Sequence, residues 1–177
     1  MGLIKVHDKE FEIYITSKAI EQRVKEIAEA INKDYLGKKP LFIAILNGSF
    51  MFAADLFRHL TIEAELCFIK LASYKGMKSS GKVVTTIGLE EDIFGKDVVI
   101  VEDIVDTGKT LHGFLPKLLH QQPNSLKIAT LLHKPEATAY PLQLDYIGFA
   151  IPDKFVIGYG LDYDGQGRNL KEIYQVK

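Results

Sequence analysis

The stretch VVIVEDIVDTGKTL, residues 98–111, joins an apolar run to three acids and a turn suited to anions. Val98 to Val101 are consecutive β-branched residues, which is typical of a strand buried in a parallel sheet. Leu111 opens a stripe of apolar residues at helical spacing that continues through residues 114–119. The stretch therefore predicts a strand that passes through a polar turn into a helix.

The sequence Gly108-Lys109-Thr110 also occurs at the end of the nucleotide-binding P-loop, but the rest of that motif is missing. A P-loop needs a glycine five positions before the Gly-Lys pair, and Asp103 occupies that position. A carboxylate there would repel the phosphates that such a loop surrounds. An ATPase or GTPase is therefore disfavoured.

The turn at Thr107, Gly108, Lys109 and Thr110 can still bind one phosphate. Backbone N–H groups at the start of a helix attract anions, and glycine allows close approach because it lacks a Cβ. The two threonine hydroxyls can add hydrogen bonds. An ordinary capped turn without a ligand is the alternative, and the tetrapeptide alone leaves both readings open.

The acids before this turn point to a sugar and a base. Glu102 and Asp103 end the strand, and adjacent carboxylates can accept hydrogen bonds from a vicinal diol or hold Mg²⁺. A solvated acidic pair is the alternative. Asp106 lies nearer the phosphate turn, where a carboxylate could accept a proton from a bound base. A ribose phosphate would use all of these groups together.

Strands and helices alternate through the middle of the chain, which predicts an α/β fold with a mainly parallel twisted sheet flanked by helices. In such sheets ligands bind beyond the carboxyl ends of the strands. Three polar loops follow predicted strands: NGSF at 47–50, EDIVDTGKT at 102–110 and HKPEAT at 133–138. We expect these loops to converge on one side of the sheet.

Local signals predict several boundaries. Ser17 is the expected N-cap of a helix that ends near Gly37, and Pro116 should kink or shorten the helix that starts near Leu111. Residues 3–15 read as one half-buried strand and residues 74–82 as a loop. EIYQVK, residues 172–177, reads as an edge strand.

Composition narrows the class of protein. The chain has 177 residues and a formal net charge of −1, so we expect one domain spanning residues 1–177 and no general affinity for nucleic acid or membrane. Its one cysteine, Cys67, lies in an apolar run and is expected to be buried. The charged N-terminal segment lacks a signal-peptide core. A soluble cytoplasmic protein is expected.

The stretch 98–111 resembles the phosphoribosyl-diphosphate-binding motif of the type I phosphoribosyltransferases. That motif has four apolar residues, two acids, two variable residues, then Asp or Glu, Thr, Gly and a Thr or Ser, and every position agrees. The resemblance implies that family's fold, with a small hood formed by the N- and C-terminal segments. It also implies Mg²⁺ as cofactor, phosphoribosyl diphosphate as substrate and a homo-oligomer, either a dimer or a tetramer.

Other segments are similar to the hypoxanthine-guanine branch of this family, which acts in purine salvage. LNGSFMFAADL looks like its diphosphate-binding loop, here with Asn47 where a lysine often precedes the glycine, Gly48. SYKGMKSSG resembles its mobile loop, in which Ser73 and Tyr74 would cover the site. IPDKFVIGYGLDYDGQGRNL is close to its purine-binding and C-terminal signature.

The resemblance implies roles for these segments. Lys134 would donate to the 6-oxygen of hypoxanthine or guanine, Phe155 would stack on the purine and Val156 would offer backbone groups to its edge. Asp162 would contact a water on Mg²⁺, and Arg168 would grip the diphosphate. Without the family context each residue has a simpler explanation. Lys134 would be a solvated lysine at a strand end, and Arg168 would form a surface ion pair. Phe155 and Val156 would pack in the core.

Two other functions fit the sequence less well. A non-catalytic regulator that senses phosphoribosyl diphosphate and binds nucleic acid would need a basic face, and the net charge of −1 argues against one. An adenine or pyrimidine phosphoribosyltransferase would conflict with Lys134, since an ammonium group cannot accept a hydrogen bond from a 6-amino group.

Overall fold

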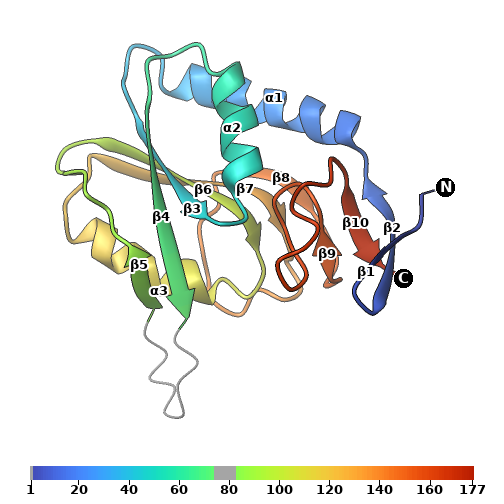
Figure 1. Ribbon diagram of the computed structural model, residues 1–177. Coiled ribbons are helices and arrows are strands. Elements are labelled where there is room, and N and C mark those ends of the chain that lie inside the picture. Colours follow the sequence, from blue (N-terminus) through green and yellow to red (C-terminus); the bar gives the residue numbers. More distant parts are fainter. Residues whose placement is uncertain (1, 74–82) are drawn as a thin grey trace.

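The computed structural model describes residues 2–73 and 83–177. Within these residues the strands form a six-stranded sheet, in the order β5-β4-β3-β6-β7-β8, and a four-stranded sheet, in the order β1-β2-β10-β9 (Figure 1). The first sheet is parallel except for β5, which runs antiparallel to β4 at one edge. The predicted α/β class and mainly parallel sheet are therefore confirmed.

The large sheet contains six strands: β3 (Leu41–Leu46), β4 (Glu65–Ser73), β5 (Val83–Ile87), β6 (Asp97–Val105), β7 (Ser125–His133) and β8 (Tyr146–Ala150). The small sheet contains β1 (Ile4–Val6), β2 (Lys9–Ile15), β9 (Val156–Ile157) and β10 (Ile173–Val176). The helices are α1 (Ser17–Asp34), α2 (Phe50–His59) and α3 (Lys109–Leu119).

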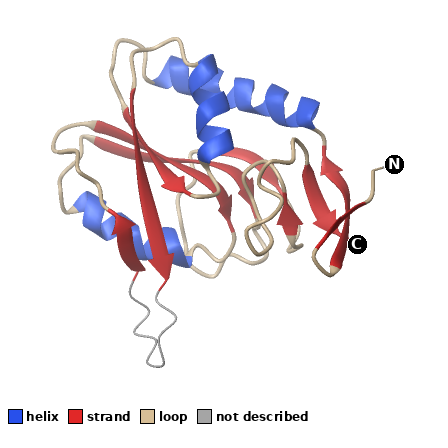
Figure 2. Ribbon diagram, viewed as in Figure 1, coloured by secondary structure: helices blue, strands red, loops and turns tan. Residues whose placement is uncertain are grey.

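The helices cover both faces of the large sheet (Figure 2). On β3, Phe42 and Ala44 join the core with α1 and α2, whereas Leu41, Ile43 and Ile45 join the core with α3. This alternation follows from the two-residue period of a strand. Because both faces are covered, the interior strand β3, LFIAIL, is a continuous apolar run, as is typical of a buried parallel sheet.

The small sheet lies beside the large one and is built from both ends of the chain (Figure 1). β10 pairs antiparallel with β2 on one side and with β9 on the other. The predicted hood of N- and C-terminal segments is thus present. The prediction that residues 172–177 form an edge strand is wrong, because β10 occupies an interior position in this sheet.

Several predicted boundaries also change. Thr16, not Ser17, caps α1, since the Thr16 hydroxyl accepts a hydrogen bond from the Ala19 N–H at 3.3 Å. The segment predicted as one strand at residues 3–15 is a hairpin of β1 and β2. α3 continues for three residues past Pro116. Its predicted apolar stripe is only partly buried, because Leu119 is 56% exposed.

None of the helices in the described part of the chain is long and apolar enough to cross a membrane. Cys67 is buried, as predicted, and burial raises the pKa of its thiol to about 12. The predicted loop at 74–82, with Tyr74, lies outside the described residues, while Ser73 is the last residue of β4.

Candidate active site

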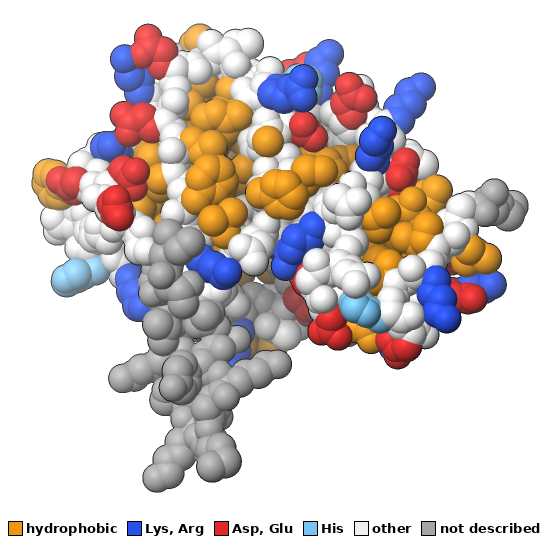
Figure 3. All heavy atoms as spheres, in the orientation of Figure 1, with side chains coloured by type: hydrophobic (Ala, Val, Ile, Leu, Met, Phe, Trp, Pro, Cys, Tyr) orange, Lys and Arg blue, Asp and Glu red, His pale blue; other side chains and the backbone are white. Residues whose placement is uncertain are grey.

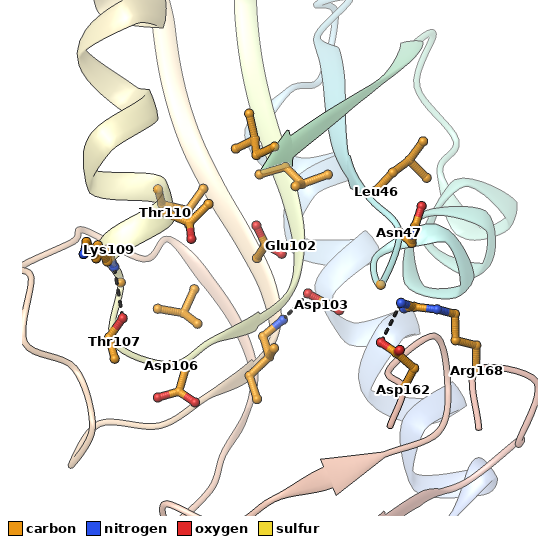
Figure 4. Close-up of a pocket in the computed structure, with 17 residues that line it drawn as sticks. Leu46, Asn47, Glu102, Asp103, Asp106, Thr107, Lys109, Thr110, Asp162 and Arg168 are labelled. Carbon is orange, nitrogen blue, oxygen red and sulfur yellow. Dashed lines mark hydrogen bonds and ion pairs between the residues drawn. The ribbon is translucent and has the colours of Figure 1, made fainter. Parts of the chain in front are cut away.

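A cavity of about 300 Å³ opens beyond the carboxyl ends of β3 and β6 (Figure 4). The parallel register of these strands, with Leu41 opposite Val98 and Ala44 opposite Val101, brings their following loops together. The cavity is lined by most of the predicted site residues: Asn47, Gly48, Glu102, Asp103, Asp106, Thr107, Gly108, Lys109, Thr110, Asp162 and Arg168. Lys134, Phe155 and Val156 lie outside this lining.

The predicted phosphate turn forms one wall of the cavity. Gly108 is the N-cap of α3 and has a positive φ of 78°. A Cβ on Gly108 would lie 2.8 Å from the Tyr140 carbonyl oxygen, so this position needs glycine for two reasons. The Thr107 hydroxyl accepts a hydrogen bond from the Lys109 N–H at 3.3 Å. The turn therefore presents helix N–H groups and threonine hydroxyls to the cavity, as a phosphate site requires.

The acidic pair lies at the centre of the cavity (Figure 4). Glu102 is only 8% exposed, and burial together with the neighbouring Asp103 charge raises its pKa well above the usual range. Burial likewise raises the pKa of Asp103. No ion pair to either carboxylate occurs within residues 2–73 and 83–177. A buried and a half-buried carboxylate without a cation are poised to accept hydrogen bonds or a metal ion.

The diphosphate loop predicted at Asn47 and Gly48 packs directly on this pair. A Cβ on Gly48 would fall 1.4 Å from the Asp103 Oδ2 atom, so no larger residue fits without moving that carboxylate. The loop is also held by Ser49, whose buried hydroxyl donates to the Ile45 carbonyl at 2.6 Å. Asn47 lines the cavity with an amide in place of the family's frequent lysine.

The loop after β9 supplies the far wall, opposite the phosphate turn (Figure 4). Arg168 pairs with Asp162 at 2.5 Å and donates through Nη1 to the Gly160 carbonyl at 2.6 Å. Gly160 in turn sits against the Gly48 backbone, where a Cβ would lie 2.0 Å from the Gly48 oxygen. The loop after β9, called the hood loop below, is therefore in direct contact with the diphosphate loop.

Of the predicted base-binding residues, Lys134 is connected to the cavity through Asp106. The Lys134 ammonium contacts Asp106 Oδ2 and Asp153 Oδ1, each at 3.0 Å. Phe155 is 44% exposed, and its ring meets that of Tyr163 edge-on at 5.5 Å. Val156 is buried in β9 and pairs with Gln175 of β10. Lys134 therefore contacts the cavity at Asp106, and Phe155 presents a partly exposed aromatic ring.

The oxygen donors in the cavity show whether its side chains suit Mg²⁺. No group of three or more His, Cys, Asp or Glu side chains that could hold a metal ion occurs among the described residues. Glu102 and Asp103 provide hard carboxylate oxygens, which suit Mg²⁺, and Mg²⁺ commonly takes only one or two protein carboxylates together with water and substrate phosphates. The donor set therefore fits a metal that is bound together with its substrate.

The sequence reading missed three residues around this cavity. Asp153 and Gly160 lie within the C-terminal signature that was recognised as a whole, but neither was assigned a role. The Thr138 hydroxyl lies 3.0 Å from the Asp106 carbonyl oxygen and 2.9 Å from that of Lys134. The location of Thr138 in the polar loop HKPEAT could have indicated a role in the site. Its hydrogen-bond partners depend on the tertiary structure.

Comparisons with known proteins agree with this geometry. A family model described as "Phosphoribosyl transferase domain" matches residues 12–164. The hypoxanthine phosphoribosyltransferase of Buchnera aphidicola is 46% identical over 167 residues, which cover 93% of this chain and 94% of that protein. The hypoxanthine-guanine phosphoribosyltransferase of Aquifex aeolicus is 39% identical, with 98% of both chains covered.

Solved structures give the same result. A crystal structure of a hypoxanthine-guanine phosphoribosyltransferase from Bacillus anthracis superposes with a TM-score of 0.87 at 39% identity and covers 94% of this chain and 96% of that one. A hypoxanthine phosphoribosyltransferase from Staphylococcus aureus gives a TM-score of 0.89 at 40% identity, covering 94% and 91%. The chain belongs to the phosphoribosyltransferase family, and the fold is that of the type I enzymes.

Proposed function

We propose that this phosphoribosyltransferase is a hypoxanthine-guanine phosphoribosyltransferase of purine salvage. It would transfer the 5-phosphoribosyl group of phosphoribosyl diphosphate to N9 of hypoxanthine or guanine, giving inosine or guanosine monophosphate and diphosphate. The observation that carries the proposal is the single cavity that combines a phosphate turn, a buried acidic pair and an arginine, and continues at Asp106 into the Lys134 contact.

The sugar phosphate has a complementary set of partners. The turn Thr107–Thr110 would bind the 5-phosphate at the α3 N-terminus. Glu102 and Asp103 would accept hydrogen bonds from the ribose diol and hold Mg²⁺ directly or through water, with Asp162 contacting a metal-bound water. Asn47, Gly48 and Arg168 would hold the diphosphate. Bound Mg²⁺ would neutralise charge on the departing diphosphate.

The purine would lie on the Lys134 side of the cavity. Phe155 would stack on the ring, Val156 would offer backbone groups to its edge, and Lys134 would donate to the 6-oxygen. As N9 bonds to the anomeric carbon, the bond from that carbon to diphosphate breaks and its electron pair leaves with diphosphate. The N7 proton of the base passes to the Asp106 carboxylate. Ser73 and Tyr74 would cover the reacting groups and exclude water.

The proposal extends to assembly and location: a cytoplasmic homo-oligomer, either a dimer or a tetramer. An apolar surface supports self-association. Phe50 of α2 is 38% exposed and Phe68 of β4 is 40% exposed, and Figure 3 shows hydrophobic side chains gathered over these two elements. Contiguous exposed apolar patches commonly mark protein interfaces. Light scattering coupled to gel filtration measures the assembly state, and a strictly monomeric protein would refute this part.

The activity is tested by incubating the protein with Mg²⁺, phosphoribosyl diphosphate and, separately, hypoxanthine, guanine, xanthine, adenine or uracil. Nucleotide formation is followed by chromatography. We expect products from hypoxanthine and guanine and none from adenine or uracil. If neither 6-oxopurine yields its nucleotide, the proposed function is wrong.

A further inference from the structure

Lys134 is held between two carboxylates that come from different parts of the chain. Asp106 follows β6, and Asp153 lies between β8 and β9. Both contact the Lys134 ammonium at 3.0 Å. The Lys134 side chain is 7% exposed, whereas those of Asp106 and Asp153 are 47% and 63% exposed. The nearly buried ammonium therefore has two ion-pair partners among the described residues: Asp106 from the cavity and Asp153 from the segment that leads into the hood.

The Lys134 backbone is fixed, so the side chain alone decides where the charge lies. Its N–H donates to the Val105 carbonyl at 2.9 Å, and its carbonyl accepts from the Ala137 N–H at 3.2 Å. The Thr138 hydroxyl also lies 2.9 Å from that carbonyl. A lysine stem has four flexible carbons. The two carboxylates are therefore the groups that set the direction of the ammonium.

The charge on Lys134 also depends on both carboxylates. Burial on its own would lower the pKa of Lys134, but the hydrogen bonds to Asp106 and Asp153 outweigh burial and place the pKa above its ordinary value. A buried charge is stable only when it is paired. Asp153 supplies one of the two described partners.

The proposed reaction changes the charge of Asp106 but not that of Asp153. An ammonium has three N–H donors, so the contacts to Asp106 and Asp153 leave one for the 6-oxygen of a purine. When Asp106 takes the N7 proton, its carboxylate becomes neutral and no longer balances the lysine charge. In this step the N7 proton passes to Asp106 and not to Asp153, so the Asp153 contact at 3.0 Å is the one that still balances the lysine charge.

We propose that Asp153 is a positioning residue of the purine site, which holds protonated Lys134 toward the 6-oxygen while Asp106 accepts the N7 proton. This inference rests on the proposed function. Without Asp153, the ammonium would turn to Asp106 alone. It would then point away from the 6-oxygen, so the contact to that oxygen would weaken.

The test is the Asp153→Asn variant, assayed at saturating phosphoribosyl diphosphate. Its substrates are hypoxanthine and unsubstituted purine, which has hydrogen in place of the 6-oxygen. Purine is measured as a substrate or as a competitor. We expect kcat/KM for hypoxanthine to fall about tenfold or more, the scale of one hydrogen bond to a charged group. Affinity for purine and for phosphoribosyl diphosphate should stay within about twofold of the parent protein.

Three further variants separate positioning from structural damage. Glu136→Gln removes an exposed carboxylate from the same loop as Lys134. Within the described part of the chain Glu136 forms no ion pair with the lysine, so this variant should retain parent selectivity. Asp153→Glu keeps the charge and should recover most of the loss. In a Lys134→Ala background, Asp153→Asn should have no further effect on hypoxanthine, because the two residues act through one contact. Thermal unfolding of each variant reports whether it is folded.

The outcomes distinguish the two proposals. If the parent protein makes no nucleotide from hypoxanthine or guanine, the proposed function fails. If the parent is active, the positioning role is wrong when Asp153→Asn matches Glu136→Gln, loses purine and hypoxanthine equally, or acts additively with Lys134→Ala.

Discussion

Replacing Gly160 by alanine should separate the hood loop from the diphosphate loop. Gly160 is buried and has a φ of 101°, a region that L side chains rarely adopt. A Cβ there would lie 2.0 Å from the Gly48 carbonyl oxygen and 3.2 Å from its carbon. Ordinary contacts begin near 3.4 Å, so the two backbones would have to move apart by more than 1 Å.

The expected loss of stability has two parts. The left-handed conformation costs about 1–2 kcal/mol for a residue with a Cβ. Forcing an extra atom into a packed site adds about 1–3 kcal/mol. Gly160→Ala should therefore lower the free energy of unfolding by about 2–5 kcal/mol. Gly37 is the matched control, because it has a φ of 75° and nothing within 4 Å of its Cβ position.

Urea unfolding of the two variants measures the difference, and calorimetric titration with phosphoribosyl diphosphate measures the site. Gly37→Ala should lose only the conformational part and bind normally. Gly160→Ala should lose more stability and bind phosphoribosyl diphosphate more weakly, since it displaces the loop beside Asp103. Equal destabilisation by both variants, with unchanged binding, would refute the reasoning that these backbones are in rigid contact.

Three more substitutions test single groups. Asp106→Asn should lower turnover about 100-fold or more, while calorimetry shows nearly unchanged phosphoribosyl diphosphate binding; weaker binding at normal turnover would contradict the proton role. Lys134→Ala should reduce the preference for hypoxanthine over adenine in competition assays, and unchanged selectivity would remove it from base recognition. Glu102 has a raised pKa when folded, so the folded state holds its proton more tightly. That contribution to stability is present at low pH and is lost as pH rises from the unfolded value through the folded one. Glu102→Gln mimics the protonated acid, so at neutral pH it should raise the Tm of the metal-free protein by a few degrees, about 2–4 °C per kcal/mol, while weakening substrate binding. A lower Tm in a thermal scan would show that the charged form of Glu102 does not destabilise the ligand-free protein.

Much of the site could be predicted because its chemistry is contiguous in sequence. Residues 98–111 contain a buried strand, an acidic pair and a phosphate turn in one run. Each part follows from local physics: β-branched residues form the strand, and a glycine with a φ of 78° starts α3. Ligands of a parallel sheet bind beyond the carboxyl ends of its strands, so the loops after β3 and β6 were expected to meet.

The errors fall where contacts join distant segments. β10 was predicted at an edge, but β2 and β9 flank it on both sides. A short strand near the chain end has the same local pattern in either position. Thr16 replaced Ser17 as the α1 cap because the two neighbouring hydroxyls are equivalent in sequence and only the helix start distinguishes them.

By itself, the sequence determined the family, the strand-to-helix turn and the acids that line it, because these depend on neighbours a few positions apart. Only the tertiary structure decided that Gly160 lies on Gly48 and that Asp153 shares Lys134 with Asp106. These contacts join residues from 19 to more than 100 positions apart. Their partners are set by how the sheet and the hood pack, and no local pattern carries that information.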